Sequence, residues 1–160
     1  MICVTGTPGT GKSKVLEVMR KRGYDVHELD EIKKCISGRE GGEIIVDERC
    51  LSTVRMEGIY FGHLSHYAKC DAVVVLRAHL KDIESRLMKR GYGRKKIMDN
   101  LECEAIDLIG YEAASLHPGR TFEIMNEEPE KTADAIEKIM RGEVPPPAVI
   151  DLTEEILAWY

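Results

Sequence analysis

Apolar and polar positions follow two different periods along the chain, which predicts strands and helices in turn. Short apolar runs rich in β-forming residues predict strands at residues 1–5, 24–29, 59–61, 71–77 and 121–125. The run at 71–77 is nearly all apolar, which is typical of a strand buried on both faces of a parallel sheet. Helical spacing of apolar residues predicts helices at 14–20, 79–90, about 95–116 and 130–141. We therefore expect an α/β layer fold with a parallel sheet flanked by helices.

The segment between the second and third predicted strands breaks this regular pattern. Residues 28–51 are polar and interrupted by glycine. The pattern predicts a short helix at 30–36, a break at 38–42, a strand-like run at 43–46 and a helix from Asp47 to about Met56. Such a segment is suited to be a mobile flap that binds an acceptor substrate.

The turn after the first strand reads Gly6-Thr7-Pro8-Gly9-Thr10-Gly11-Lys12-Ser13, which fits the phosphate-binding pattern G-x-x-x-x-G-K-[ST]. Its glycines let backbone N–H groups approach phosphate oxygens, and the helix that follows adds the positive end of its dipole. Lys12 can reach the β- and γ-phosphates, and the Ser13 hydroxyl can bind Mg²⁺. We expect ATP phosphates to be held by six consecutive residues: Gly9, Thr10, Gly11, Lys12, Ser13 and Lys14.

Composition limits the classes of protein to which the chain can belong. The 160 residues suit one soluble domain, and no apolar run approaches a membrane span. We expect no signal peptide, because the first predicted strand begins at once. The net charge of −5 argues against general affinity for nucleic acid. Five scattered cysteines without a C-x-x-C pair suggest reduced thiols in a cytoplasmic protein rather than disulfides or a zinc site.

A second group of basic residues reduces the number of functions that fit this phosphate-binding loop. Arg86 and Arg90 lie one turn apart on one predicted helix face, just before a basic glycine loop at 91–96. Their guanidinium groups there can neutralise charge on a transferring phosphoryl group, which suits a small kinase with a lid. The alternative is that they form an ordinary solvated helix face.

The C-terminal end of the chain differs in composition. Three prolines at 145–147 predict a stiff spacer, and residues 151–160 can form a short capped helix. This helix either packs back on the domain or serves as a docking tail for a partner.

The ordered set of motifs resembles the adenylate kinase isoenzyme 6 family, the CINAP-type kinases, in its archaeal form. The resemblance covers about residues 1–140. It is carried by the phosphate loop and by four further stretches: Gly62-His63-Leu64-Ser65-His66-Tyr67, Val73-Val74-Val75-Leu76-Arg77-Ala78-His79, Arg86-Leu87-Met88-Lys89-Arg90-Gly91-Tyr92 and Asn100-Leu101-Glu102-Cys103-Glu104-Ala105.

The resemblance implies a P-loop, nucleoside monophosphate kinase-like domain at 1–143 with a central five-stranded sheet. A monophosphate-binding segment is expected at about 28–51, a short lid at about 90–100, and the spacer and tail helix at 144–160. The implied reaction is ATP + AMP giving two ADP in the cytoplasm, with Mg²⁺ bound to ATP. Lys12, Arg86 and Arg90 are the expected catalytic residues. The family also implies ATP hydrolysis and a role in small ribosomal subunit assembly, through a small-subunit ribosomal protein.

One position departs from the family pattern. An acidic residue usually ends the third strand, where it helps to hold Mg²⁺ through water, but the gapless register places Phe61 there. A register shifted by four inserted residues offers Glu57 instead, and Asp30 is a further candidate for helping with Mg²⁺. His63 and His66 are candidates for polarising water or contacting phosphate, or else for structural histidines at a strand end.

Two functions therefore remain open. The first is phosphoryl transfer from MgATP to AMP, with catalysis by positioning and charge neutralisation. The second is an ATPase switch in ribosome assembly with little kinase activity, which Phe61 and the tail favour.

Overall fold

The computed structural model describes residues 1–148 and 150–159. Its centre is a parallel sheet of β1 (Ile2–Thr5), β2 (Val26–Glu28), β5 (Ile59–Phe61), β6 (Ala72–Arg77) and β7 (Thr121–Met125). The strands run in the order β2-β5-β1-β6-β7, and every neighbouring pair is parallel. The predicted α/β class and the five-stranded parallel sheet are thus confirmed.

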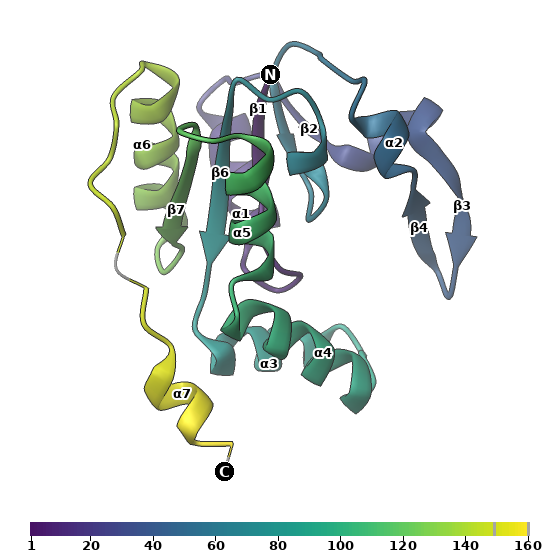
Figure 1. The fold of residues 1–160 in the computed structure, drawn as a ribbon, viewed down its shortest axis with the longest axis vertical. Helices are drawn as coiled ribbons and strands as arrows, with labels where there is room; N and C mark the ends of the chain where they lie inside the picture. Colours follow the sequence, from purple (N-terminus) through teal and green to yellow (C-terminus); the bar gives the residue numbers. More distant parts are fainter. Residues whose placement is uncertain (149, 160) are drawn as a thin grey trace.

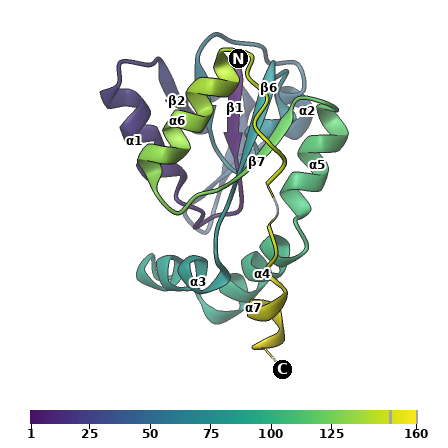
Figure 2. The same ribbon diagram turned by 90° about the vertical axis from the view of Figure 1, so that its left-hand side faces the viewer.

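Helices cover both faces of this sheet. Figure 2 shows α1 (Lys12–Lys21) and α6 (Pro129–Met140) on one side, with α5 (Leu108–Leu116) and α2 (Glu48–Leu51) on the other. Side chains of β6 alternate between the two layers, because successive residues of a strand face opposite sides. Val74 packs in the cluster under α1 and α6, whereas Val73 and Val75 pack in the cluster that includes Ala113 of α5.

A separate layer lies beyond the carboxyl ends of the strands, where α3 (Leu80–Lys89), α4 (Arg94–Ala105) and α7 (Thr153–Leu157) meet (Figure 1). The single helix expected at 95–116 is wrong, because the chain turns between α4 and α5. Asp107 adopts left-handed backbone with φ 54°, and its carboxylate lies 2.9 Å from Nη1 of Arg77. The break lets carboxylates from both sides of the turn reach this one guanidinium group.

The segment at 28–51 folds differently from the sequence prediction. Figure 1 shows a projecting hairpin of β3 (Ile36–Glu40) and β4 (Glu43–Val46), which pair as a separate antiparallel sheet. The predicted break at 38–42 is wrong over most of its length; only Gly41 and Gly42 form the turn, with φ 55° and 81°.

The short helices around this hairpin also differ from expectation. The helix expected at 30–36 is replaced by two 3₁₀ helices, Leu29–Glu31 and Lys33–Cys35. Asp47 caps α2 as predicted by accepting from the N–H groups of Arg49 and Cys50. The helix nevertheless ends at Leu51 rather than near Met56, since Val54 beyond it turns into the core.

The cysteines correct a further expectation. The predicted reduced thiols are wrong for four of the five, because Cys3 is bonded to Cys70 and Cys35 to Cys50, while Cys103 is free. Cys70 precedes β6, the neighbour of β1, so strand pairing brings it to Cys3 across 67 positions. Scattered spacing in the sequence gives no sign of such a pairing.

The C-terminal helix packs back on the domain. Leu152 is buried with side chains of α3 and α4 in one apolar cluster. The tail therefore has the packed arrangement and not that of a free docking segment. Across the described residues, no helix has the length and apolar character needed to cross a membrane.

Candidate nucleotide site

The glycine loop joins β1 to α1 at the carboxyl end of the central strand. Gly6, Gly9 and Gly11 have φ of 141°, 95° and 92°, which disfavour any side chain. A Cβ atom on Gly6 would lie 2.5 Å from the carbonyl oxygen of Leu76, and one on Gly11 would lie 2.6 Å from Nδ2 of Asn126. The loop therefore needs glycine for both its backbone and its close contacts.

Buried side chains from distant elements hold this loop. The Thr7 hydroxyl donates to Glu104 of α4 at 2.6 Å, and the amide of Asn126 donates to the carbonyl of Thr10 at 2.7 Å. Thr132 of α6 in turn donates to Asn126 at 2.7 Å. Neither Glu104 nor Asn126 is among the site residues predicted from the sequence. Asn126 directly follows a predicted strand, at the edge where ligands bind in such sheets, and that position is a usable signal.

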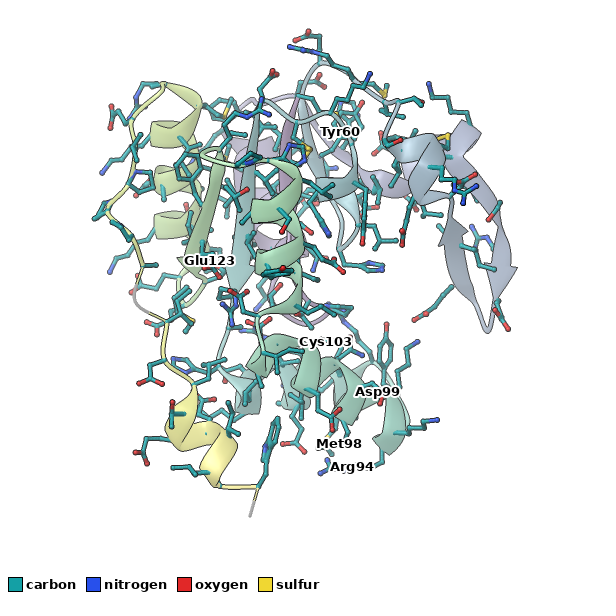
Figure 3. All side chains as sticks on the ribbon, viewed as in Figure 1. Tyr60, Arg94, Met98, Asp99, Cys103 and Glu123 are labelled. Carbon is teal, nitrogen blue, oxygen red and sulfur yellow. A yellow bond between two sulfur atoms is a disulfide. The ribbon has the colours of Figure 1, made fainter. Side chains whose placement is uncertain are left out.

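Glu104 also belongs to a buried ion cluster around Arg77, the last residue of β6. Arg77 donates to Glu104 at 2.8 Å and to Glu123 at 2.6 Å, and it also faces Asp107. Figure 3 labels Glu123 on β7. One guanidinium faces three carboxylates, and burial raises the pKa of Asp107 to about 7. The cluster ties the phosphate loop to β6, β7 and α4.

Lys12 lies at the centre of the loop. Its Nζ donates to the carbonyl oxygens of Gly6 at 2.6 Å and Thr7 at 3.0 Å. Burial lowers the pKa of Lys12 to about 7; Glu104 opposes this shift, and the charge of Arg90 adds to it. An anion placed beside this amine would favour its charged form.

Two cavities open at the loop. The larger, of about 500 Å³, extends from the loop to Tyr67, Leu108 and Ile109, and the smaller, of about 410 Å³, lies under the hairpin beside Leu29 and Phe61. Both have sizes typical of small-molecule sites. The two cavities share five lining residues: Lys12, Ser13, Glu43, Gly62 and His63.

The predicted arginines both lie at the loop. Arg86 donates from Nη1 to the carbonyl of Gly9 at 2.8 Å, and Arg90 lines the larger cavity. Of the predicted phosphate-binding residues, Gly9, Gly11, Lys12 and Ser13 line this cavity as well. The Thr10 side chain is buried and donates to the carbonyl of Thr7. Lys14 is exposed and lies on the outer side of α1, in a shallow pocket with Glu17 and Pro129.

The remaining predicted site residues differ in whether they line a cavity. His63 lines both cavities, and desolvation, followed by the charge of Lys12, lowers its pKa to about 4. His66 is buried between Thr5, at 2.8 Å, and Glu112, at 3.1 Å, which favours its structural reading. Asp30 lines the smaller cavity together with Ser13.

Three side chains bridge the mouth of the larger cavity and are not among the predicted site residues. Glu43 of the hairpin forms an ion pair with Lys96 of α4 and accepts from the Tyr92 hydroxyl at 3.2 Å. Figure 3 labels Cys103, Asp99, Met98 and Arg94 on the same helix, α4. Cys103 itself lines the larger cavity.

The oxygen donors beside the loop fit a magnesium ion carried by a nucleotide. Within the described residues, no group of three or more His, Cys, Asp or Glu side chains is placed to hold a metal by itself. Ser13 and the carboxylates of Glu28 and Asp30 line one cavity, and Mg²⁺ accepts few protein oxygens when phosphates and water supply the rest.

A parallel sheet, a glycine loop that opens a helix, a half-buried lysine and two arginines define a P-loop nucleotide-binding protein with a nucleoside monophosphate kinase-like fold. The family model described as an AAA domain matches residues 2–107. A solved deoxyadenosine kinase from M. mycoides has the same fold, with a TM-score of 0.54 and 16% identity over 88% of this chain and 98% of its own.

Sequence comparison gives the particular family. The chain is 42% identical over 149 residues to a "Putative adenylate kinase" of Archaeoglobus fulgidus, covering 89% of this chain and 83% of the relative. A protein of the same name from Methanothermobacter thermautotrophicus is 38% identical over 170 residues, covering 98% and 99%. The chain belongs to this archaeal family of adenylate kinase-type phosphotransferases, as the resemblance in the sequence indicated.

Proposed function

We propose that this protein transfers the γ-phosphoryl group of MgATP to AMP and so forms two ADP. The observation that carries the proposal is the wall shared by the two cavities. Two nucleotides bound in them would bring their phosphates together at Lys12, Ser13 and His63. Phosphoryl transfer needs little more than such positioning and charge neutralisation.

Each basic group has a role in this reaction. Lys12 exchanges its bonds to the Gly6 and Thr7 carbonyls for bonds to phosphate oxygens, and phosphate restores its charge. Arg86, held against the loop, and Arg90, in the cavity wall, neutralise the transferring group. Ser13 would hold the Mg²⁺ that ATP brings, with help from Asp30, and the ion would supply charge neutralisation at the phosphates.

Two segments would enclose the substrates. We assign residues 28–51 to binding of the monophosphate and residues 90–100 to the lid, within a kinase domain at 1–143. The contact from Glu43 to Tyr92 and Lys96 supports this assignment, because it joins the two segments over the larger cavity. Closure excludes water, which otherwise diverts the phosphoryl group to hydrolysis.

The test is nucleotide chromatography of the products of MgATP alone and of MgATP with AMP. We expect AMP to be consumed and two ADP to appear for each ATP. Lys12→Ala should abolish this reaction, whereas Lys21→Ala, an exposed lysine at the other end of the same helix, should leave it unchanged. Unchanged turnover in Lys12→Ala would contradict the assignment of the loop.

A second candidate is an ATPase switch in small-subunit assembly, with a small-subunit ribosomal protein as partner. The resemblance to the CINAP-type kinases supports the partner, and buried Phe61 at the usual acidic position supports low kinase activity. ATP that yields ADP and phosphate while AMP stays intact is the outcome that favours this candidate. The predicted cytoplasmic location suits either activity. The two disulfides do not contradict this location, because intracellular disulfides are known in hyperthermophilic archaea.

A further inference from the structure

The N-terminus of α3 is completed by a side chain from the other end of the chain. Among the described residues, the side chain of the N-cap residue, His79, makes no bond to the first turn of this helix. Instead, Glu155 of α7 accepts from the backbone N–H of Leu80 at 2.6 Å. A carboxylate at this place satisfies a free N–H group and interacts favourably with the helix dipole.

The same carboxylate fixes the residue that precedes the helix. The other oxygen of Glu155 lies 2.6 Å from Nδ1 of His79, and Glu127 lies 3.0 Å from Nε2 of that ring. Two carboxylates therefore face the two ring nitrogens, and they raise the pKa of His79, Glu155 more strongly than Glu127. In its charged form the ring donates to both, so it joins α7 to the loop after β7.

Apolar packing holds the tail in place. Leu152 is 5% exposed and belongs to one cluster with Ile83 and Leu87 of α3 and with Ile97 and Leu101 of α4. Asp151 accepts from the N–H of Thr153 at 2.9 Å and so starts α7 directly after this anchor. Figures 1 and 2 both show α7 against the layer that α3 and α4 form.

α3 carries this contact to the phosphate loop. Leu80 begins the helix, and Arg86, six residues later, donates to the carbonyl of Gly9. Six residues of α-helix span about 9 Å. Arg90 follows at the C-cap and lines the larger cavity. An interaction that fixes one end of this short helix therefore fixes the direction of both arginines.

We propose that residues 150–159 are a positioning element of the site and that Glu155 is a positioning residue for Arg86 and Arg90. The kinetic part of this proposal rests on the proposed function. The structural part, that Glu155 restrains α3, does not.

The test compares Glu155→Ala, Glu155→Gln and the control Glu154→Ala in the full chain. Glu154 is its exposed neighbour on α7. Amide hydrogen exchange should accelerate by about fivefold in the first turn of α3 in Glu155→Ala, the effect of losing one helix cap. Glu155→Gln, which retains an acceptor for the Leu80 N–H, should recover part of this protection. Glu154→Ala should exchange like the unmodified protein.

Enzyme kinetics and MgATP binding then test positioning. In Glu155→Ala we expect kcat to fall by about threefold to tenfold while KM for AMP changes less, because the arginines act on the transferring group. Unchanged exchange in α3 overturns the proposal, and so does faster exchange with unchanged kcat. If the unmodified protein forms no ADP from AMP, the proposed function fails. The affinity for MgATP, measured by calorimetry, then decides: a loss in Glu155→Ala but not in Glu154→Ala supports positioning, and equal affinities overturn it.

Discussion

Glu43 and Lys96 form an ion pair across the mouth of the larger cavity although they are 53 positions apart in the chain. The Lys96 ammonium also lies 4.2 Å from the ring centroid of Tyr92, whose hydroxyl donates to Glu43. Both charged side chains are about half exposed, at 53% and 44%. The pair therefore joins the hairpin to α4 by a contact that is easily opened, as the proposed closure of the lid over substrates requires.

Glu43→Gln should weaken this contact without changing the fold. Half-exposed ion pairs contribute about 0.2–1 kcal/mol, so the apparent KM for nucleotides should rise by less than about fivefold with kcat unchanged or higher. Added salt should reduce the difference from the unmodified protein, because it screens exposed charges. Steady-state kinetics at two ionic strengths measure both effects.

Glu40→Gln is the matched control, on the neighbouring strand of the same hairpin and exposed. Equal changes in the two variants would mean that general charge, rather than the Glu43–Lys96 pair, sets the affinity.

Glu104→Gln should destabilise the whole domain. The carboxylate accepts from Thr7, from Arg77 and from the N–H of Ala78, and it is 2% exposed. Breaking a buried ion pair by removing one charge costs about 3–5 kcal/mol. Denaturant unfolding measures the loss.

Glu102→Gln, at an exposed position of the same helix, should stay within about 0.5 kcal/mol of the unmodified protein. A small loss of unfolding free energy in Glu104→Gln would show that Arg77 finds sufficient partners in Glu123 and Asp107.

The strands, the glycine loop and α3 could be predicted from the sequence because each is encoded locally. Residues 72–76 are apolar on both faces, and residues 80–87 repeat apolar side chains at helical spacing. The turn at Asp107 could not be predicted, because the contact that accompanies it is with Arg77, which is distant in the sequence. The hairpin differs, because Gly41-Gly42 is a local signal for a tight turn between strands, and the predicted break at 38–42 did not make use of it.

Candidate site residues could be found where a motif fixes them. Lys12 and Ser13 belong to the loop and line the larger cavity together with Arg90, and Arg86 donates to the carbonyl of Gly9. Glu104 could not be found, because a carboxylate on an amphipathic helix gives no sign of the partners it meets after folding. Disulfide partners were missed for the same reason, since strand order rather than spacing brings Cys3 to Cys70.

The two disulfides should stabilise the fold and should differ in how easily a thiol reductant reaches them. Cys3 and Cys70 are both buried, whereas Cys50 is half-buried, so a thiol reductant should open Cys35–Cys50 first. Replacing both Cys35 and Cys50 by serine frees a loop of 15 residues, which corresponds to about 3 kcal/mol. Thermal unfolding with and without reductant measures this effect.

Cys103→Ser is the control and should unfold like the unmodified protein, since this thiol is free. If the variant with both Cys35→Ser and Cys50→Ser unfolds at the same temperature as the unmodified protein, this disulfide contributes nothing to its stability.

Nucleotide binding should take up a proton at Lys12. Burial lowers the pKa of its amine from 10.5 to about 7 in the nucleotide-free protein, so at pH 8 and above most molecules hold a neutral lysine. Phosphate favours the charged form, so the affinity for MgATP should fall as pH rises above 7, by up to about tenfold per pH unit. Calorimetry at pH 7.5–9.5 in buffers of different ionisation enthalpy measures the proton taken up.

The lowered pKa of Lys12 also changes how the stability of the nucleotide-free protein depends on pH. Between pH 7 and 10.5 the unfolded chain binds a proton at Lys12 that the folded chain has released, so this group makes the fold more stable as pH rises through that window. Lys12→Met should lose both the proton uptake and this contribution to the pH dependence of unfolding. Proton uptake that persists in Lys12→Met would assign it to another group, and Asp107, with a pKa of about 7, would be the next to test by Asp107→Asn.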